Sequence, residues 1–101
     1  MIQEIRAKIA VDLFELSRHA VDQSLKRGIT IAEMLEAIAI AELIEDYPQD
    51  KYGPTCLILG YTQAKRPLRI LCSYPTRPLI KIITVYEPDP QQWIDHRVRK
   101  A

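Results

Sequence analysis

The stretch from Thr55 to Tyr86, TCLILGYTQAKRPLRILCSYPTRPLIKIITVY, decides the fold. It contains the apolar runs Thr55–Tyr61, Leu68–Ser73 and Leu79–Tyr86, which polar or proline-containing segments separate. Runs of this length with hairpin-length connections predict neighbouring antiparallel strands. Gly60, inside the first run, indicates a bulge or a close approach of another backbone.

Before this stretch the apolar spacing is helical. A first helix is expected over residues 2–11, and its apolar face is Ile2, Ile5, Ile9 and Leu13. Ser17 is a suitable N-cap for a second helix, which Gly28 ends just after Arg27 by adopting a left-handed conformation. The small or apolar stripe of this second helix is Ala20, Val21, Ser24 and Leu25.

A capping box at Thr30–Glu33 predicts the start of a third helix, because the hydroxyl and the carboxylate each satisfy a backbone donor. This helix should run to about Ile40. Its expected buried residues are Ile31, Leu35 and Ile38. Residues 43–47 favour a short first strand over an extension of the helix, and residues 48–54 have loop composition.

The order of elements predicts one α+β domain over residues 1–101. N-terminal helices should pack on one face of a three- or four-stranded antiparallel sheet. Asp89 can cap a short C-terminal helix that carries Trp93, and Trp93 is interpreted as a core anchor. The other face of the sheet, or its rim, should stay partly open, and we expect function there.

Composition indicates an ordinary soluble protein of 101 residues, with 27% charged and 48% hydrophobic residues. No apolar run approaches the roughly 20 residues of a membrane span, and no secretory signal is recognised. Cys56 and Cys72 are too few for a disulfide scaffold, so we expect reduced thiols and a cytoplasmic location.

Charge is distributed unevenly along the chain. Residues 1–54 carry six Lys and Arg against ten Asp and Glu, whereas residues 55–101 carry eight against three. A basic half can mark an anionic partner. Equally, a helical half and a sheet half can simply neutralise each other.

His19 and Arg27 lie eight residues apart, hence on similar faces of the second helix. His19 can act as an acid or base near neutral pH, and Arg27 can bind a phosphate. The alternatives are structural: His19 packs at the helix start, and Arg27 interacts favourably with the helix dipole.

Arg69 stands in mid-strand beside apolar neighbours, which makes it a candidate for anion binding or, alternatively, a residue of a solvated sheet face. Tyr74 and Tyr86 lie at strand ends, where a tyrosine can stack on a base but often only packs.

Known cofactor and metal motifs are missing from the sequence. His19, His96, Cys56 and Cys72 are not spaced like a zinc site, and there is no P-loop, GxGxxG, GxSxG or HExxH motif. We therefore expect no metal and no cofactor, and the two cysteines are interpreted as small buried hydrophobic residues.

Several spaced motifs resemble a bacterial family, domain of unknown function 4258. They are FELSRHA at 14–20, KRGI at 26–29, IEDYPQD at 44–50, CLILG at 56–60, Pro67-Leu68, and ITVYEPD at 83–89 with Trp93. The resemblance implies a fold similar to RelE/BrnT-like toxins, which cut RNA without metal on the open face of the sheet and are restrained by an antitoxin protein. The family commonly has a His where this chain has Arg69. A guanidinium stays protonated and cannot act as acid or base, but it can stabilise charge on a phosphorane.

The leading hypothesis is therefore a metal-independent endoribonuclease of the toxin–antitoxin type. Its expected catalytic residues are His19, Arg27, Arg69 and Tyr86, and its expected RNA-binding residues are Arg66, Tyr74, Arg77 and Lys81. The alternative is a non-catalytic module that binds a protein or RNA through the same face. No DNA or membrane partner is expected, and the sequence leaves the oligomeric state open.

Overall fold

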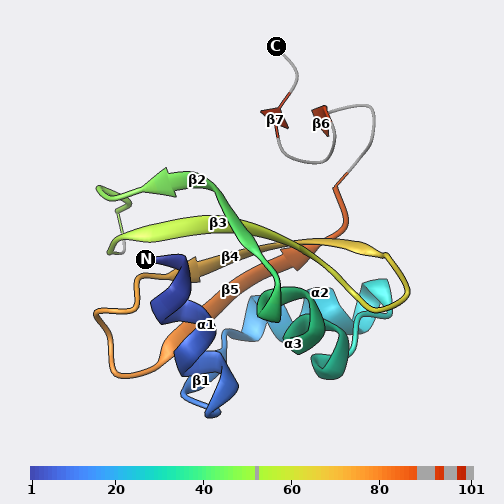
Figure 1. Ribbon diagram of the computed structural model, residues 1–101, viewed down its shortest axis with the longest axis horizontal. Helices are drawn as coiled ribbons and strands as arrows, with labels where there is room; N and C mark the ends of the chain where they lie inside the picture. Colours follow the sequence, from blue (N-terminus) through green and yellow to red (C-terminus); the bar gives the residue numbers. More distant parts are fainter. Residues whose placement is uncertain (52, 89–92, 95–97, 100–101) are drawn as a thin grey trace.

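A layer of helices covers one face of a β-sheet (Figure 1). The computed structural model describes residues 1–51, 53–88, 93–94 and 98–99. Within these residues the elements are α1 (Ile2–Ala10), β1 (Phe14–Leu16), α2 (Arg18–Arg27), α3 (Ile31–Ala39), β2 (Glu42–Tyr47), β3 (Thr55–Tyr61), β4 (Pro67–Ser73), β5 (Ile80–Tyr86), β6 (Trp93–Ile94) and β7 (Val98–Arg99).

The larger sheet that these residues form has five strands in the order β1-β5-β4-β3-β2. Strands β2 to β5 form an antiparallel meander, and their bounds agree with the predicted runs to within one residue. The predicted α+β class is therefore confirmed.

The predicted sheet of three or four antiparallel strands is wrong, because β1 adds a parallel strand. Phe14–Leu16 pairs with Ile80–Ile82 of β5. Three residues are too few to show an alternating pattern, and Leu13 before them continues the helical spacing. In the structure α1 ends at Ala10, and Asp12 turns the chain with a φ of 62°.

The predicted ends of α2 and α3 are confirmed. Ser17 Oγ accepts a hydrogen bond from the backbone N–H of Ala20 at 3.0 Å, and Gly28 adopts the left-handed conformation with a φ of 63°. Thr30 Oγ1 accepts from the N–H of Glu33, and a Glu33 carboxylate oxygen accepts from the N–H of Thr30. At both helix starts, a side-chain oxygen accepts a hydrogen bond from a backbone N–H that has no partner within the helix.

The core lies between the helices and the sheet. Its buried residues include Ile5 and Ile9 of α1, Ala20 of α2, Met34, Ala37 and Ile38 of α3, and Cys56, Ile58, Leu68, Ile70, Cys72, Ile80, Ile82 and Val85 of the sheet. This list confirms that Leu68, Ile70 and Cys72 share a face of β4, as the alternation predicted.

In α2 and α3, the residues that face the core differ in part from the predicted ones. Ile38 is buried and Leu35 partly buried, but Ile31 is 52% exposed because the central positions of α3 belong to Met34 and Ala37. In α2, only the small residues of the predicted stripe, Ala20 and Ser24, face the core. Val21 and Leu25 are exposed.

The predicted C-terminal helix is not observed at Trp93–Ile94, the part of it that the structure describes. Asp89 lies outside the described residues, but Trp93–Ile94 forms strand β6, which pairs with Val98–Arg99. The prediction of a helix at residues 93–94 is therefore wrong. Its main support was an aspartate flanked by prolines, and Asp and Pro are also common turn residues.

Gly60 is the point of closest approach between the helix layer and the sheet. A Cβ atom at this position would overlap the carbonyl group of Ala37 in α3 and lie 3.0 Å from its Cα. Only glycine allows the two backbones to pack this closely. The prediction of a close backbone approach is thus confirmed.

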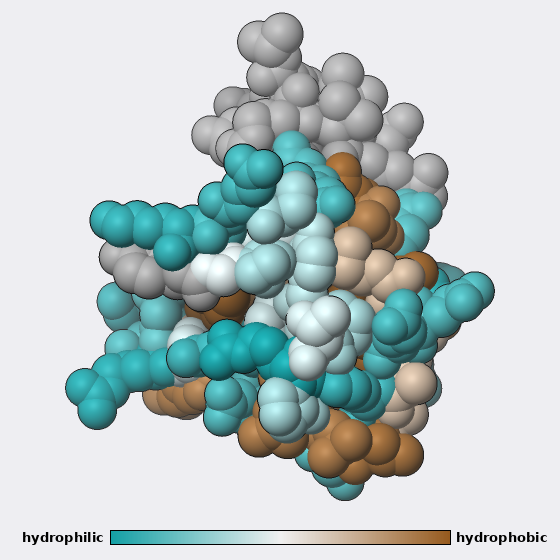
Figure 2. All heavy atoms as spheres, turned by 90° about the vertical axis from the view of Figure 1, so that its left-hand side faces the viewer, coloured by the Kyte–Doolittle hydropathy of each residue, from teal (hydrophilic) through white to brown (hydrophobic). Residues whose placement is uncertain are grey.

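Figure 2 shows the side of the molecule that carries α1, where hydrophilic side chains spread over most of the surface and hydrophobic ones lie along its lower edge and at its right. In the described part of the chain, no helix combines the length and the apolar character that crossing a membrane requires.

Substitution of Gly60 by Ala should destabilise the fold by about 3 kcal/mol or more, because backbone atoms of α3 must move to admit the methyl group. Gly28→Ala is the matched control. Gly28 has open space around its Cα, so this change brings only left-handed strain of roughly 1–2 kcal/mol. Urea unfolding of both variants measures the difference, and an equal or smaller loss for Gly60→Ala would contradict the close contact.

Candidate functional site

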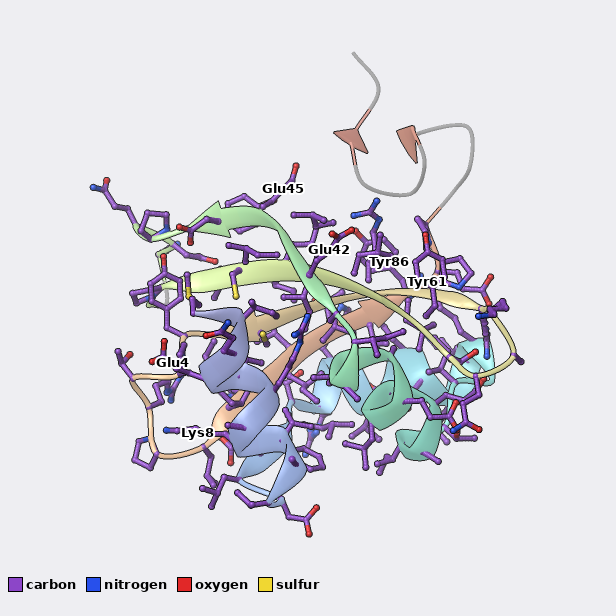
Figure 3. All side chains as sticks on the ribbon, in the orientation of Figure 1. Glu4, Lys8, Glu42, Glu45, Tyr61 and Tyr86 are labelled. Atoms are coloured by element: carbon purple, nitrogen blue, oxygen red, sulfur yellow. The ribbon has the colours of Figure 1, made fainter. Side chains whose placement is uncertain are left out.

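The face of the sheet opposite the helices carries a continuous row of side chains. Glu42, Leu59, Arg69 and Tyr86 are consecutive cross-strand neighbours from β2 to β5. Glu42 and Tyr86 lie on this side together with Glu45 (Figure 3). We refer to this side as the open face, because none of the described helices covers it.

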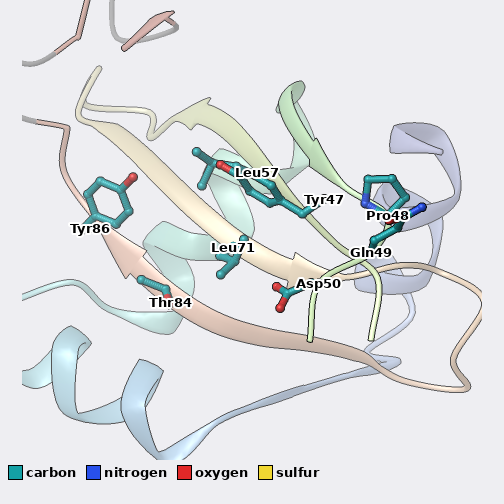
Figure 4. A pocket seen from close by; sticks show the side chains of 8 residues that line it. All are labelled: Tyr47, Pro48, Gln49, Asp50, Leu57, Leu71, Thr84 and Tyr86. Atoms are coloured by element: carbon teal, nitrogen blue, oxygen red, sulfur yellow. The ribbon is translucent and has the colours of Figure 1, made fainter. Parts of the chain in front are cut away.

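The open face contains a hollow of about 670 Å³. Its lining consists of Tyr47, Pro48, Gln49, Asp50, Leu57, Leu71, Thr84 and Tyr86 (Figure 4). Thr84 and Tyr86 of β5 lie at one end, and the chain that follows β2 forms the other end. Leu57 and Leu71 form the floor between them.

The floor exists because β3 carries leucines on its second face and β4 places Leu71 beside one of them, between Arg69 and Ser73. Leu57 and Leu71 are directly paired across the two strands, and their sequence neighbours point into the core. In an open antiparallel sheet, the second face would ordinarily carry polar residues. Leu57 is already buried at 4% exposure, so the half-buried Leu71 is the member of the pair that a ligand can cover further.

Hydrogen bonds shape the wall of the hollow after β2. Asp50 Oδ2 accepts from Thr55 Oγ1 at 2.8 Å, and the N–H of Asp50 donates to the carbonyl of Tyr47 at 3.2 Å. The Tyr47 hydroxyl donates to Glu45. Among the described residues that line the hollow, Asp50 is the one with a charged side chain, so the hollow is apolar with an acidic end.

The structure brings three of the four predicted catalytic residues to the end of β5. Arg69 and Tyr86 are cross-strand neighbours, and Arg27 Nη1 donates to the carbonyl of Val85 at 3.2 Å. His19 is exposed and lies near the other end of α2, about 12 Å from Arg27 along the helix axis. Tyr86 is the one predicted site residue that lines the hollow.

Arg69 is 0% exposed, so the alternative that it belongs to a solvated face is wrong. A guanidinium in this position has left bulk water, which is costly unless its charge is compensated. Its neighbours Leu59 and Tyr86 place it in the row of the open face, beside the hollow.

Arg27 belongs to a set of side chains that complete the outer edge of β5. Beyond β1, Ser17 Oγ donates to the carbonyl of Ile83, and Gln23 Oε1 accepts from the N–H of Val85. Arg27 then donates to the carbonyl of the same Val85. These bonds satisfy backbone groups that an edge strand otherwise exposes to other chains. Sequence reasoning missed this role, because nothing local marks Gln23 as a partner of a strand 62 residues away.

The guanidinium of Arg66 makes contacts within the protein, so it is not free to bind RNA phosphates. Its guanidinium donates to the carbonyls of Arg27 and Gly28 at 2.9 and 3.0 Å, and it pairs with Glu33 and Glu87. The pairing with Glu87 raises the pKa of Arg66, and the N–H of Thr30 together with Arg66 holds the pKa of Glu33 below its usual value. Arg66 thus joins the end of α2, the start of α3 and the end of β5.

The other predicted RNA-binding residues lie at the far end of β4. Tyr74, Arg77 and Lys81 follow this seven-residue strand, about 20 Å from Arg66 at its start. The Tyr74 hydroxyl donates to Asp46, which raises the pKa of Tyr74 to about 12. The four residues therefore do not form one basic surface.

Cys56 and Cys72 pair across β3 and β4 on the face that the helices cover, with 3.9 Å between their sulfur atoms. Both are free and buried, which agrees with their interpretation as small core residues. The contact with Cys56 and burial raise the pKa of the Cys72 thiol. Within the described residues, no three His, Cys, Asp or Glu side chains are grouped as a metal site would need.

A family model described as "Domain of unknown function (DUF4258)" matches residues 16–87, from β1 to the end of β5. The chain belongs to this family. The matched range of the DUF4258 domain includes the whole hollow and omits α1. No curated protein and no solved structure matches the chain.

The residues of the hollow other than Tyr86 were not predicted as functional from the sequence. The available signal was the run TCLILG at 55–60, which lacks the polar alternation of a strand with one solvated face. Alternation that fails in this way indicates that something covers the second face. Tyr47 and Asp50 gave no comparable signal, because Tyr47 only ends the predicted strand 43–47 and Asp50 lies in the segment 48–54 of ordinary loop composition.

Replacing Arg66 with Ala should destabilise this DUF4258 domain by about 2 kcal/mol, since it leaves two backbone carbonyls and two carboxylates without their cation. Arg77→Ala is the matched control, because Arg77 is exposed in a loop and its loss should change the free energy of unfolding by less than about 0.5 kcal/mol. Chemical denaturation measures both. Equal effects would show that the Arg66 contacts contribute nothing.

Proposed function

We propose that the chain is a non-catalytic binding module that takes a segment of a partner protein into the hollow of the open face. The observation that carries this proposal is the largely apolar lining of the hollow, to which Leu57, Leu71, Tyr47 and Tyr86 contribute on the side without described helices. The volume of about 670 Å³ lies in the range of pockets that hold small ligands or a few side chains.

The chemistry of the lining supports a protein segment as the ligand. Tyrosines offer large contact areas with little loss of conformational freedom, and they are enriched where proteins bind one another. A segment that covers Leu71 and the rings of Tyr47 and Tyr86 would gain roughly 25 cal/mol for each Å² of apolar surface removed from water.

The distribution of charge argues against RNA as the ligand of the hollow. RNA binding depends on several cations that contact phosphates along one surface. Arg66 is paired with Glu33 and Glu87, Arg77 lies at the opposite end of β4, and the charged group in the lining is the carboxylate of Asp50.

A second candidate function is a metal-independent endoribonuclease similar to RelE/BrnT-like toxins. One observation favours it, namely that Arg27 bonds the β5 backbone at Val85, one residue before Tyr86, which is the cross-strand neighbour of Arg69. The burial of Arg69 and the position of His19 near the start of α2 make it the weaker candidate. Its partner would be an antitoxin protein.

Selection from a displayed library of random heptapeptides tests the binding module. We expect the wild type and Leu25→Lys, a change on the exposed side of α2, to enrich the same peptides. Thr84→Lys places a charge and a long side chain in the hollow and should lose them, while its circular dichroism stays native. Enrichment of the same peptides by Thr84→Lys, or of none by the wild type, would contradict the proposal.

Incubation of the purified protein with total bacterial RNA in EDTA separates the two candidates. The binding module predicts that RNA remains intact with the wild type and with His19→Ala alike. Cleavage by the wild type that His19→Ala abolishes would establish the ribonuclease instead, because a contaminating nuclease would be present in both preparations.

A further inference from the structure

We infer that the hollow selects a segment in which an arginine stands next to an apolar residue, with the guanidinium bound by Asp50. This inference rests on the proposed binding function and specifies the chemistry of the partner. The partner is a protein segment with a cationic side chain, and an anionic segment is rejected.

The carboxylate of Asp50 is oriented but not neutralised. Its Oδ2 accepts a hydrogen bond from the hydroxyl of Thr55, a residue that is only 4% exposed and therefore a fixed donor. A hydroxyl is uncharged, so the bond holds the carboxylate in place and leaves its negative charge. Within the described residues, Asp50 makes no ion pair with a Lys or Arg side chain.

The position of Asp50 couples the charge to the apolar floor. Asp50 lies toward the Pro48–Gln49 end of the hollow, on the same side of the sheet as Leu71 (Figure 4). A ligand that rests an apolar side chain on Leu71 therefore has a neighbouring side chain within reach of the carboxylate.

Arginine suits this end of the hollow better than lysine. A guanidinium pairs with a carboxylate through two parallel hydrogen bonds and stacks on aromatic rings, and the lining of the hollow includes Tyr47 and Tyr86. A lysine ammonium is a more strongly hydrated point charge and gains less from the ring. A glutamate at this place would meet Asp50 with a like charge.

Fluorescein-labelled pentapeptides with the cores Gly-Leu-Arg-Leu-Gly, Gly-Leu-Gln-Leu-Gly and Gly-Leu-Glu-Leu-Gly provide the test, read by fluorescence anisotropy. We expect the wild type to bind the arginine peptide about fivefold more tightly than the glutamine peptide, and the glutamate peptide most weakly. Asp50→Asn keeps the size of the side chain and an acceptor for Thr55, and it should abolish the preference. Asp22→Asn, on the exposed side of α2, is the matched control and should retain it.

Salt gives a second measurement that does not depend on a variant. The preference for arginine over glutamine should shrink when the ionic strength rises from 50 to 500 mM, because salt screens a partly exposed pair. Equal binding of all three peptides by the wild type would overturn the inference and leave the binding module standing. No binding by any peptide, together with a failed library selection, would overturn both.

Discussion

The close approach of α3 to β3 at Gly60 determines which face of the sheet is covered. Because Gly60 has no side chain, the backbone at Ala37 packs directly on the strand, and α3 delivers Met34 and Ile38 to the core. The contact places the helix layer on one side of the sheet. The opposite side is then free of described helices, although Leu57 and Leu71 make it apolar.

The distribution of the basic residues follows from the same arrangement. α2 lies along the outer edge of β5, where Arg27 and Gln23 complete the backbone hydrogen bonds that β1 is too short to provide. Arg66 ties the ends of three elements together. Arg27 and Arg66, which suggest phosphate binding in the sequence, therefore bond to backbone groups of the fold. The open face contains an apolar hollow with Asp50 in its lining.

Elements with strong local signals could be predicted from the sequence, whereas contacts between distant segments could not. The caps at Ser17 and Thr30 and the four long strands depend on neighbouring residues, so local pattern sufficed. β1 is held by pairing with β5 and has no pattern of its own. The hollow needed the three-dimensional register of Leu57 with Leu71, and the burial of Arg69 needed the sheet as a whole.

A methyl NMR titration of the leucine-labelled protein with a peptide enriched in the library selection shows directly which face binds the ligand. The account predicts that the methyl signals of Leu57 and Leu71 shift with a common saturation curve, while those of Leu25 on α2 stay unchanged. Shifts at Leu25 without shifts at Leu57 and Leu71 would contradict it, because the ligand would then bind the helix layer and not the open face.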